Sequence, residues 1–396
     1  MAKKVEKRVP DVRFKGFTDD WERRKGKDYL SESFIPGNTG SNSRKLTVKL
    51  WGKGVVKKQV IGNGSKNTKY YLRKPGQLIY GKLDFIHAAF GIVPKELIGY
   101  ESTIDSPAFD ITDGSPIFLL NLFLRREFYE RFGLMANGSR RAKRIHEKDF
   151  LNMPFFAGSY NEQKKIGEII LKISNLITLQ HKKLEQLRLF RKAMLQQLFA
   201  NNNEKSPHIF LKAFNEEWKN HKLSWAFSER KERSGTGQLL SVSISNGVHP
   251  FDEELRKNNS SKDKSHYKIV QKGDIAYNSM RMWQGAEGIS NYDGIVSPAY
   301  TVLSPNKGIN ALFFNFMFKR TEMLRSFQRH SQGLTSDTWN LKYPLLKEIT
   351  IKAPDKKEQE LLGALLFRLD MLIDKKQKSL SQFMTLKKFL LQKMFI

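Results

Sequence analysis

One long segment occurs twice in the chain, and this duplication limits the folds that the chain can adopt. Residues 161–200 read NEQKKIGEIILKISNLITLQHKKLEQLRLFRKAMLQQLFA, and residues 357–396 read KEQELLGALLFRLDMLIDKKQKSLSQFMTLKKFLLQKMFI. An offset of 196 residues aligns the two copies and places Gly167 against Gly363. A period this long is typical of a duplicated domain, because solenoid repeats are only about 20–50 residues long.

The repeat also covers the rest of the chain. RFKGFTDDW at residues 13–21 matches FLKAFNEEW at residues 210–218, and YYLRKPGQLIYGKL resembles YKIVQKGDIAYNSM. We therefore expect two equivalent halves. The predicted segments are a first domain at residues 1–156, a central spacer helix at 157–202, a second domain at 203–353 and a C-terminal spacer helix at 354–396.

Each domain is expected to mix strands and helices. Runs rich in β-branched and aromatic residues, such as GQLIYGKL and GIVSPAYTVL, predict strands, whereas IFLLNLFLRREFYERF and ALFFNFMFKRTEMLRSFQRH predict helices. The alternating βαβ order of a nucleotide-binding sheet is missing. The predicted fold class is α+β: two tandem-duplicated α+β domains, separated and followed by long α-helices that pair as an antiparallel, pseudo-two-fold symmetric coiled coil.

The duplicated segments have the spacing of a coiled coil. Apolar residues recur at alternating steps of four and three residues, and neither segment contains proline. Polar residues interrupt the pattern at equivalent places, as at Gln180 and Lys376, which we expect to face each other near the pseudo-two-fold axis. The residues predicted to pair the helices are Ile166, Ile170, Ile173, Ile177, Gln180, Leu184, Leu187, Leu362, Leu366, Leu369, Ile373, Lys376, Leu380 and Phe383.

A second set of apolar residues widens the stripe on both helices beyond a two-helix seam. Either it packs against the protein's own domains, or it docks the helices of another protein. The residues predicted to dock a partner subunit are Ile169, Leu176, Phe190, Leu365, Leu372 and Leu386.

The charge of the chain predicts a polyanionic partner. A net charge of +29 exceeds what solubility requires and favours nucleic acid, the alternative being a generally basic proteome. The chain has no cysteine, which excludes disulfides and fits a reducing compartment. No apolar run is long enough to span a bilayer, and the N-terminus lacks a signal sequence, so we expect a cytoplasmic protein without membrane contact.

Motifs that carry chemistry are missing from the sequence. It contains no phosphate-binding loop, no dinucleotide-binding glycine motif, no Asn-Pro-Pro-aromatic run of an amino-methyltransferase and no metal-ligand spacing. Ser106-Pro107 and Ser297-Pro298 are interpreted as turns, not as nucleophiles. We therefore expect no catalytic residue, no metal ligand and no cofactor bound by this chain.

Candidate DNA contacts lie in segments that mix basic, amide and aromatic side chains. GSRRAKR at residues 138–144 suits phosphate contacts and guanine readout, because arginine can donate two hydrogen bonds to one guanine. In the second half SQGLTSDTW takes its place and lacks the basic cluster. For each candidate the alternative is a solvated charge or a buried ring. The predicted DNA-binding residues are Tyr80, Lys82, Arg140, Arg141, Lys143, Arg144, Tyr277, Asn278, Ser279, Arg281 and Trp283.

Together these features resemble a known family. Two variable domains, each followed by a long helix that opens with Glu-Gln, and the lead-in RFKGFTDDWE resemble the specificity subunit of type I restriction–modification enzymes. The resemblance covers essentially the whole chain, and NSMRMWQGAEGISNYDGIVSPAYTVL looks like part of a target recognition domain. One departure is Gly158-Ser159 before the first Glu-Gln, where the second copy has Pro354-Asp355 and the family usually has proline.

The resemblance implies a division of labour between subunits. Each target recognition domain would read one half of a bipartite sequence in double-stranded DNA, and the helices would act as a ruler and dock two methyltransferase subunits. Those subunits would carry S-adenosylmethionine and methylate adenine N6, and restriction/translocase subunits that use ATP and Mg would join for cleavage. The alternatives are a stand-alone DNA adenine methyltransferase and a non-enzymatic coiled-coil adaptor.

Overall fold

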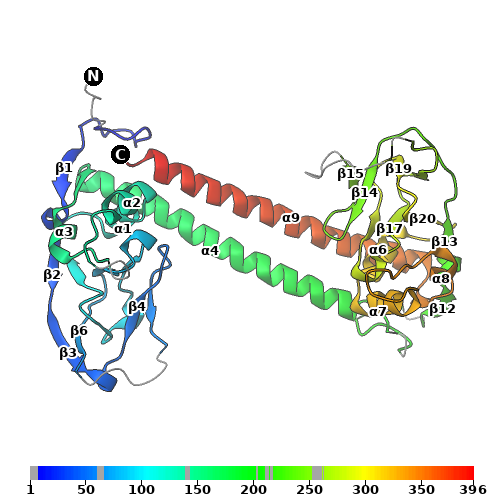
Figure 1. Cartoon of the computed structure of the whole chain (residues 1–396), viewed down its shortest axis with the longest axis horizontal. Coiled ribbons are helices and arrows are strands. Elements are labelled where there is room, and N and C mark those ends of the chain that lie inside the picture. Colours follow the sequence, from blue (N-terminus) through cyan, green and yellow to red (C-terminus); the bar gives the residue numbers. More distant parts are fainter. Residues whose placement is uncertain are drawn as a thin grey trace. The chain divides into compact units, whose positions relative to one another are not determined.

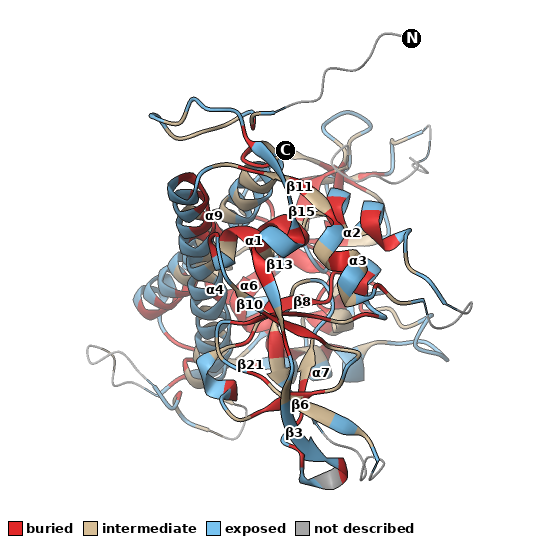
Figure 2. Ribbon diagram, turned by 90° about the vertical axis from the view of Figure 1, so that its left-hand side faces the viewer, coloured by how far each residue is buried: buried red, intermediate tan, exposed pale blue. Residues whose placement is uncertain are grey.

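The computed structural model describes residues 8–59, 67–138, 143–201, 204–209, 214, 217–251, 261 and 263–396. The fold is mixed α+β, as predicted. Its most prominent elements are two helices of 38 residues each, α4 (Tyr160–Gln197) and α9 (Lys356–Lys393) (Figure 1). Buried residues gather in the globular parts of the chain, whereas α4 and α9 keep much exposed surface (Figure 2).

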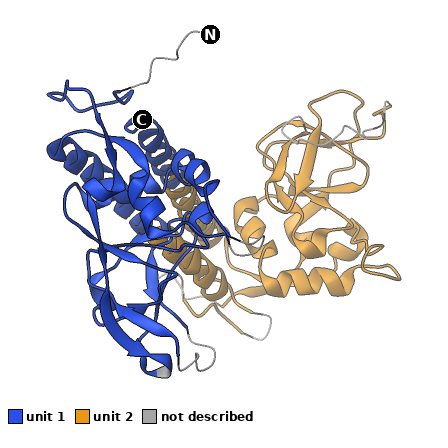
Figure 3. Cartoon of the chain, turned by 60° about the vertical axis from the view of Figure 1, so that its left-hand side comes forward, with its two compact units in different colours: residues 1–181, 379–396 blue, residues 182–378 orange. Residues whose placement is uncertain are grey.

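The chain divides into two compact units, and each unit takes part of both long helices. Unit 1 comprises residues 1–181 and 379–396, and unit 2 comprises residues 182–378 (Figure 3). Each unit therefore contains one globular domain, one end of α4 and one end of α9. The compact units do not follow the predicted segment boundaries, because those boundaries separated the domains from the helices.

Unit 1 is built on a four-stranded antiparallel sheet with the strand order β2-β10-β7-β8. Its strands are β2 (Leu30–Ser33), β7 (Leu78–Tyr80), β8 (Phe90–Ile92) and β10 (Ala108–Ile111). The smaller sheets pair β1 (Glu22–Lys25) with β11 (Pro154–Ala157), β4 (Leu46–Val48) with β5 (Val55–Lys57), and β6 (Lys69–Leu72) with β3 (Ile35–Thr39) and β9 (Glu101–Ser102). The short α-helices are α1 (Pro116–Phe123), α2 (Arg126–Gly133) and α3 (Glu147–Asn152).

Unit 2 repeats this construction with the strand order β13-β20-β17-β18. Its strands are β13 (Phe227–Glu229), β17 (Ile275–Asn278), β18 (Glu287–Ile289) and β20 (Tyr300–Pro305). The smaller sheets pair β12 (Lys219–Lys222) with β21 (Thr350–Ala353), β14 (Leu240–Ser243) with β15 (Gly247–Pro250), and β16 (Lys268–Val270) with β19 (Gly294–Val296). The short α-helices are α5 (Leu223–Ala226), α6 (Ala311–Phe318), α7 (Thr321–His330) and α8 (Tyr343–Leu346).

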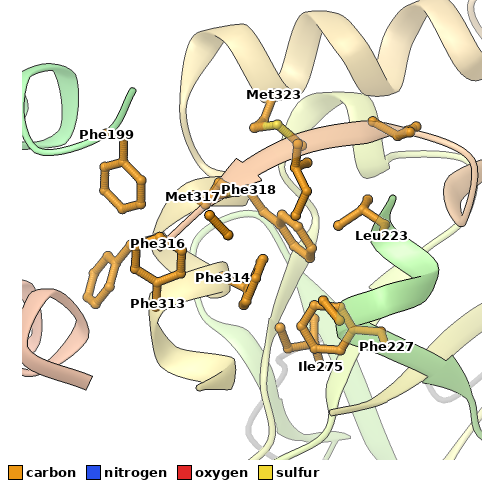
Figure 4. Packing of buried hydrophobic residues seen from close by; sticks show 14 of the residues in the cluster. Phe199, Leu223, Phe227, Ile275, Phe313, Phe314, Phe316, Met317, Phe318 and Met323 are labelled. Atoms are coloured by element: carbon orange, nitrogen blue, oxygen red, sulfur yellow. The ribbon is translucent and has the colours of Figure 1, made fainter. Parts of the chain in front are cut away.

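Aromatic residues form the core of each unit. In unit 2, Phe227, Phe314 and Phe318 pack beneath the sheet, and Phe199, just beyond the end of α4, joins the same cluster (Figure 4). In unit 1, Phe395, just beyond the end of α9, takes the equivalent place in the core. Because each buried phenylalanine contributes roughly 1.5–3 kcal/mol, both helix ends are firmly attached to a domain.

The Glu-Gln pair at the start of each long helix anchors that helix to its domain. In unit 1 the buried Glu162 accepts two hydrogen bonds of 2.8 Å from Arg13 and one of 2.9 Å from the indole N–H of Trp21. The neighbouring Gln163 accepts from the backbone N–H of Ser115, at the start of α1, and donates to the Gly158 carbonyl. The lead-in segment and α1 are therefore both fixed to the first turn of α4.

Unit 2 has an equivalent anchor, in which the described residues form two fewer hydrogen bonds to the glutamate. Glu358 accepts from the indole N–H of Trp218 at 3.4 Å, and Gln359 accepts from the backbone N–H of Asn310 at 3.0 Å. Asp355 accepts from the backbone N–H of Glu358, as Ser159 does from that of Glu162, so either residue serves before Glu-Gln as a helix cap. The departure from the usual proline therefore leaves the first helix start intact.

Each long helix also crosses the start of a short helix at close range. A Cβ atom added to Gly167 would lie 3.0 Å from the Ser115 hydroxyl, and one added to Gly363 would lie 3.2 Å from the backbone nitrogen of Phe313. Glycine is repeated here because the two backbones approach too closely for a side chain.

An arginine holds the other end of each long helix. Arg125 donates to the backbone oxygen of Ile396 and lies over the ring of Phe395, with 5.6 Å between the guanidinium carbon and the ring centroid. Arg320 donates to the Ala200 carbonyl at 3.3 Å and lies 5.2 Å over the ring of Phe199. Each domain thus binds the start of one long helix and the end of the other.

The predicted seam is the least exposed face of both helices. All fourteen residues predicted to pair the helices are buried or half-buried. Within unit 2, Arg188 donates to Gln377 at 3.0 Å and Arg191 forms an ion pair with Asp370, so α4 and α9 run antiparallel there. The contact expected between Gln180 and Lys376 stays a prediction, because these residues belong to different units.

Candidate nucleic-acid interface

An equivalent loop follows α2 in unit 1 and α7 in unit 2. We call residues 134–144 the α2 loop and residues 331–340 the α7 loop. Two backbone hydrogen bonds between Asn137 and Arg144 close the α2 loop, and two between Gln332 and Asn340 close the α7 loop. The framework of the two loops is therefore the same, while their sequences differ.

Buried side chains hold the base of the α2 loop. Tyr80 is fully buried in β7, and its hydroxyl donates to the Ile145 carbonyl at 2.9 Å. Lys82 is also buried and forms an ion pair of 2.5 Å with Glu147, while its carbonyl accepts from the Ile145 N–H. The prediction that Tyr80 and Lys82 contact DNA is corrected, because neither side chain reaches the surface; instead they position the loop.

Two of the basic residues predicted to contact DNA lie in the described part of the α2 loop. Lys143 is exposed, and Arg144 is half-buried and forms an ion pair of 3.0 Å with Asp105. Arg140 and Arg141, predicted to contact DNA, lie outside the described residues. Of the two predicted contacts that the structure describes in this loop, Lys143 is more open to a ligand than Arg144.

The equivalent residues of unit 2 are buried as well. Tyr277 is fully buried in β17, and burial raises the pKa of its phenol. Ser279 is buried with its hydroxyl 2.8 Å from that of Thr301, and its carbonyl accepts from the Leu341 N–H beside the α7 loop. DNA contacts by Tyr277 and Ser279 are therefore also corrected, for the same reason as in unit 1.

The other three candidates of unit 2 lie at its surface. Asn278 and Arg281 line a groove of about 540 Å³ beside the β14–β15 hairpin, together with Ser243 and Ser245. Arg281 is exposed, and its guanidinium donates to Gln284 at 3.1 Å. These amide, hydroxyl and guanidinium groups are the types that hydrogen-bond to base edges.

Trp283 lies against the α7 loop. Its ring is half-buried and meets that of Trp339 edge to face, with 5.2 Å between the ring centroids. Its indole N–H donates to the Met280 carbonyl at 3.1 Å. The structure thus joins the predicted Trp283 to the loop, and its main contact is with the protein itself.

Sequence reasoning missed an exposed tryptophan at the tip of the β4–β5 hairpin. Trp51 has a positive φ of 59°, rare for a bulky residue, and its side chain is 55% exposed. Its backbone N–H donates to the His87 carbonyl, and its ring meets that of His87 edge to face at 5.6 Å. The repeat gave no signal for it, because the equivalent hairpin of unit 2 has no tryptophan.

The residues predicted to dock a partner subunit are mostly exposed on the long helices. The exposed side chains are Leu176 (40%), Phe190 (53%), Leu365 (44%), Leu372 (41%) and Leu386 (42%). Ile169 differs, because it is half-buried and packs on the core of unit 1. The first of the two interpretations, packing on the protein's own domains, therefore holds for Ile169.

The described ranges contain neither a metal-binding cluster nor a membrane-spanning helix. No group of three or more His, Cys, Asp or Glu side chains is placed to hold a metal ion. No helix there is long and apolar enough to cross a membrane.

Comparison with solved structures identifies the fold. The type I restriction–modification system S subunit from M. genitalium is 16% identical, with a TM-score of 0.59, and the match covers 98% of this chain and 99% of that chain. The chain has the fold of a type I S subunit. The HsdS subunit from Thermoanaerobacter tengcongensis is 14% identical, with a TM-score of 0.50 and coverage of 95% and 96%. No protein-family model and no curated protein matches the sequence.

Proposed function

We propose that the chain is the DNA sequence-specificity subunit of a cytoplasmic type I restriction–modification complex. The observation that carries the proposal is the combination of one repeated framework with two different sets of surface loops. A repeated framework positions two domains in the same way on their helices, and different loops let each domain bind a different half-site.

Each domain is proposed to read one half of a bipartite target in double-stranded DNA. In unit 1 the basic α2 loop and the exposed Trp51 are the groups available for DNA. In unit 2 the groove with Asn278 and Arg281 offers donors and acceptors for base edges. The large positive charge supports binding to the phosphates at both half-sites.

The long helices are proposed to set the spacing of the half-sites and to dock two methyltransferase subunits. Their exposed leucines and Phe190 form apolar surface of the kind that marks protein interfaces. In this proposal S-adenosylmethionine, ATP and Mg are bound by the methyltransferase and restriction/translocase subunits, and this chain performs no reaction of its own.

The test is a genome-wide map of adenine methylation in cells that carry this chain with its partner subunits. We expect methylation at one bipartite sequence, with two short half-sites separated by a fixed number of unread base pairs. Exchanging the α2 loop alone should change one half-site and leave the other and the spacing unchanged.

Two results would contradict the proposal. If the purified chain bound S-adenosylmethionine and methylated DNA alone, it would be a stand-alone methyltransferase. If methylation were identical with and without this chain, it would be an adaptor without a role in sequence recognition.

A further inference from the structure

Unit 2 contains a basic groove that the sequence-reading loops do not explain. The groove has a volume of about 900 Å³ and lies between the last turns of α4 and the start of α7. The cations that line it include Lys192 from α4, Lys319 from the end of α6, and Arg325 and Arg329 from α7. We call these four residues the groove cations.

Three of the four groove cations have no acidic partner in the described part of the chain, and the fourth, Lys319, lies 4.0 Å from the buried Glu287. All four side chains are exposed, and no ion pair joins Lys192, Arg325 or Arg329 to an acidic side chain in the described part of the chain. The acidic residue in the lining, Glu322, lies 3.3 Å from the buried Arg320. Arg325 and Arg329 are four residues apart, so they point from the same face of α7.

The groove cations are not needed for the fold. Arg320, which holds the end of α4, has an equivalent in unit 1, where Arg125 holds the end of α9. The groove cations on α6 and α7 have no such equivalents: Lys319, Arg325 and Arg329 correspond to Leu124, Glu130 and Leu134. Unit 1 reaches the same architecture without cations at these positions. Lys319 partly offsets the burial of Glu287, whereas the charges of Arg325 and Arg329 have no such partner in the described structure and serve something other than packing.

The chemistry of the groove favours phosphate over a protein segment. The residues that line it are polar or charged, except Leu195, and none of them is aromatic apart from His208. Protein interfaces gain their energy mainly from buried apolar and aromatic anchors, which this groove lacks. Guanidinium groups, in contrast, bind phosphate oxygens through two parallel hydrogen bonds, and phosphates dominate the affinity of DNA-binding proteins.

We propose that the groove cations bind the sugar–phosphate backbone of the DNA duplex, outside the bases that unit 2 reads. The inference rests on the proposed function and adds a second, sequence-independent contact on this unit. Contacts of this kind fix the position of a protein on DNA and carry no sequence information. Removing them should weaken binding to every sequence equally and leave the recognised sequence unchanged.

The experiment compares two double variants of the full chain, each assembled with its methyltransferase subunits. Arg325→Ala/Arg329→Ala removes two groove cations, and Lys182→Ala/Lys183→Ala removes two exposed cations elsewhere on α4. DNA binding is measured against salt concentration, on a duplex with the methylated target and on a random duplex. The groove variant should lower the slope of log K against log salt by about 2, since each phosphate contact contributes about 0.9.

The lost contacts should weaken binding roughly tenfold or more at physiological salt on both duplexes, and the control should keep the parental slope. Arg325→Lys/Arg329→Lys should retain most of the slope, because lysine keeps the charge. A groove variant with the parental slope and affinity would overturn the proposal. Two other results would also overturn it. If the variant bound DNA normally but no longer assembled with its subunits, the groove would be a protein-docking site. If the methylated sequence changed, the groove would read bases.

The same measurements distinguish a failure of the proposed function from a failure of the inference about the groove. If the parental complex bound both duplexes equally, the chain would not be a specificity subunit, whatever the groove variant did. If the parental complex discriminated between them and the groove variant had no effect, only the inference about the groove would be wrong.

Discussion

The buried carboxyl group of Glu287 should make unit 2 less stable as the pH rises. Glu287 lies in β18 opposite Tyr277, its side chain has no exposed surface, and neither carboxyl oxygen has a hydrogen-bond partner in the described structure. The nearest cation is the Lys319 ammonium at 4.0 Å. Burial raises the pKa of Glu287 to about 8, and Lys319 offsets this only in part. The equivalent residue of unit 1 is Phe90, packed among aromatic rings.

The sign and size of the effect follow from the two protonation states. The unfolded chain releases the Glu287 proton near the ordinary glutamate pKa of about 4.3, whereas the folded chain keeps it until about pH 8. Between these values the folded state binds more protons, so stability falls as the pH rises and levels off above the folded pKa. At about 1.4 kcal/mol per pH unit, the loss between about pH 6 and about pH 8 is roughly 2 kcal/mol.

Replacing Glu287 with glutamine removes this titration and keeps the shape of the side chain. Urea denaturation read peptide by peptide through hydrogen–deuterium exchange gives the stability around β17 and β18 separately from unit 1. We expect the Glu287→Gln variant to lose roughly 2 kcal/mol less than the parent over this pH range. Glu185→Gln, at an exposed site on α4, is the matched control and should follow the parent. If the parent and Glu287→Gln kept parallel pH profiles, the carboxyl group would be ionised in the folded state and the reasoning would be wrong.

Three further predictions concern the long helices, two of them their attachment to the domains and one their length. Glu162→Gln should lower the stability of unit 1 by about 2 kcal/mol, because the buried carboxylate accepts three hydrogen bonds from Arg13 and Trp21. Glu358→Gln should destabilise unit 2 by less in the same urea assay, because Glu358 accepts one hydrogen bond of 3.4 Å from Trp218. Gly363→Ala should destabilise unit 2 by about 1 kcal/mol in thermal unfolding, because the added Cβ would crowd the start of α6. Elsewhere in a helix the same substitution normally stabilises. Inserting four helix-forming residues at the unit boundary of both long helices should lengthen each helix by about 6 Å. The methylated target should then gain one or two unread base pairs between its half-sites. An active complex with unchanged spacing would show that the helices do not set the distance.

The existence and extent of the two long helices were predictable from sequence, whereas the burial of four predicted DNA contacts was not. The apolar residues of a long helix follow a local period, so the face that it buries could be found by counting, and all fourteen residues predicted on that face are buried or half-buried. Tyr80 and Tyr277 were misassigned because glycine and polar residues follow them in the sequence, a pattern typical of a loop. Both tyrosines in fact belong to a central strand of the sheet, and their side chains are buried in the core. Which face a short strand buries depends on its neighbours in the sheet, and these are distant in sequence.

The physical role of Glu-Gln was hidden for the same reason. Glu162 is bound by Arg13 and Trp21, which precede it by 149 and 141 residues, so no local pattern connects them. Once the contacts are known, the signal in the sequence is plain: each Glu-Gln occurs with one upstream tryptophan, in TDDW and NEEW. The motif on which the resemblance in sequence rests is thus the contact between a domain and its helix.

The two units of this one chain separate what is kept from what varies. The residues that join domain and helix recur with the same contacts in both halves: the Glu-Gln pair, the tryptophan, the close glycine, and the arginine over a phenylalanine. The surface groups differ at every place considered, in the α2 and α7 loops, at the hairpin tips and in the groove of unit 2. Random sequence change would alter the domain–helix contacts and the surface loops alike. The contacts are therefore under a stronger constraint than the loops. The proposed function accounts for this distribution: equivalent contacts would position the two domains alike on their helices, and different surfaces would give each domain its own half-site.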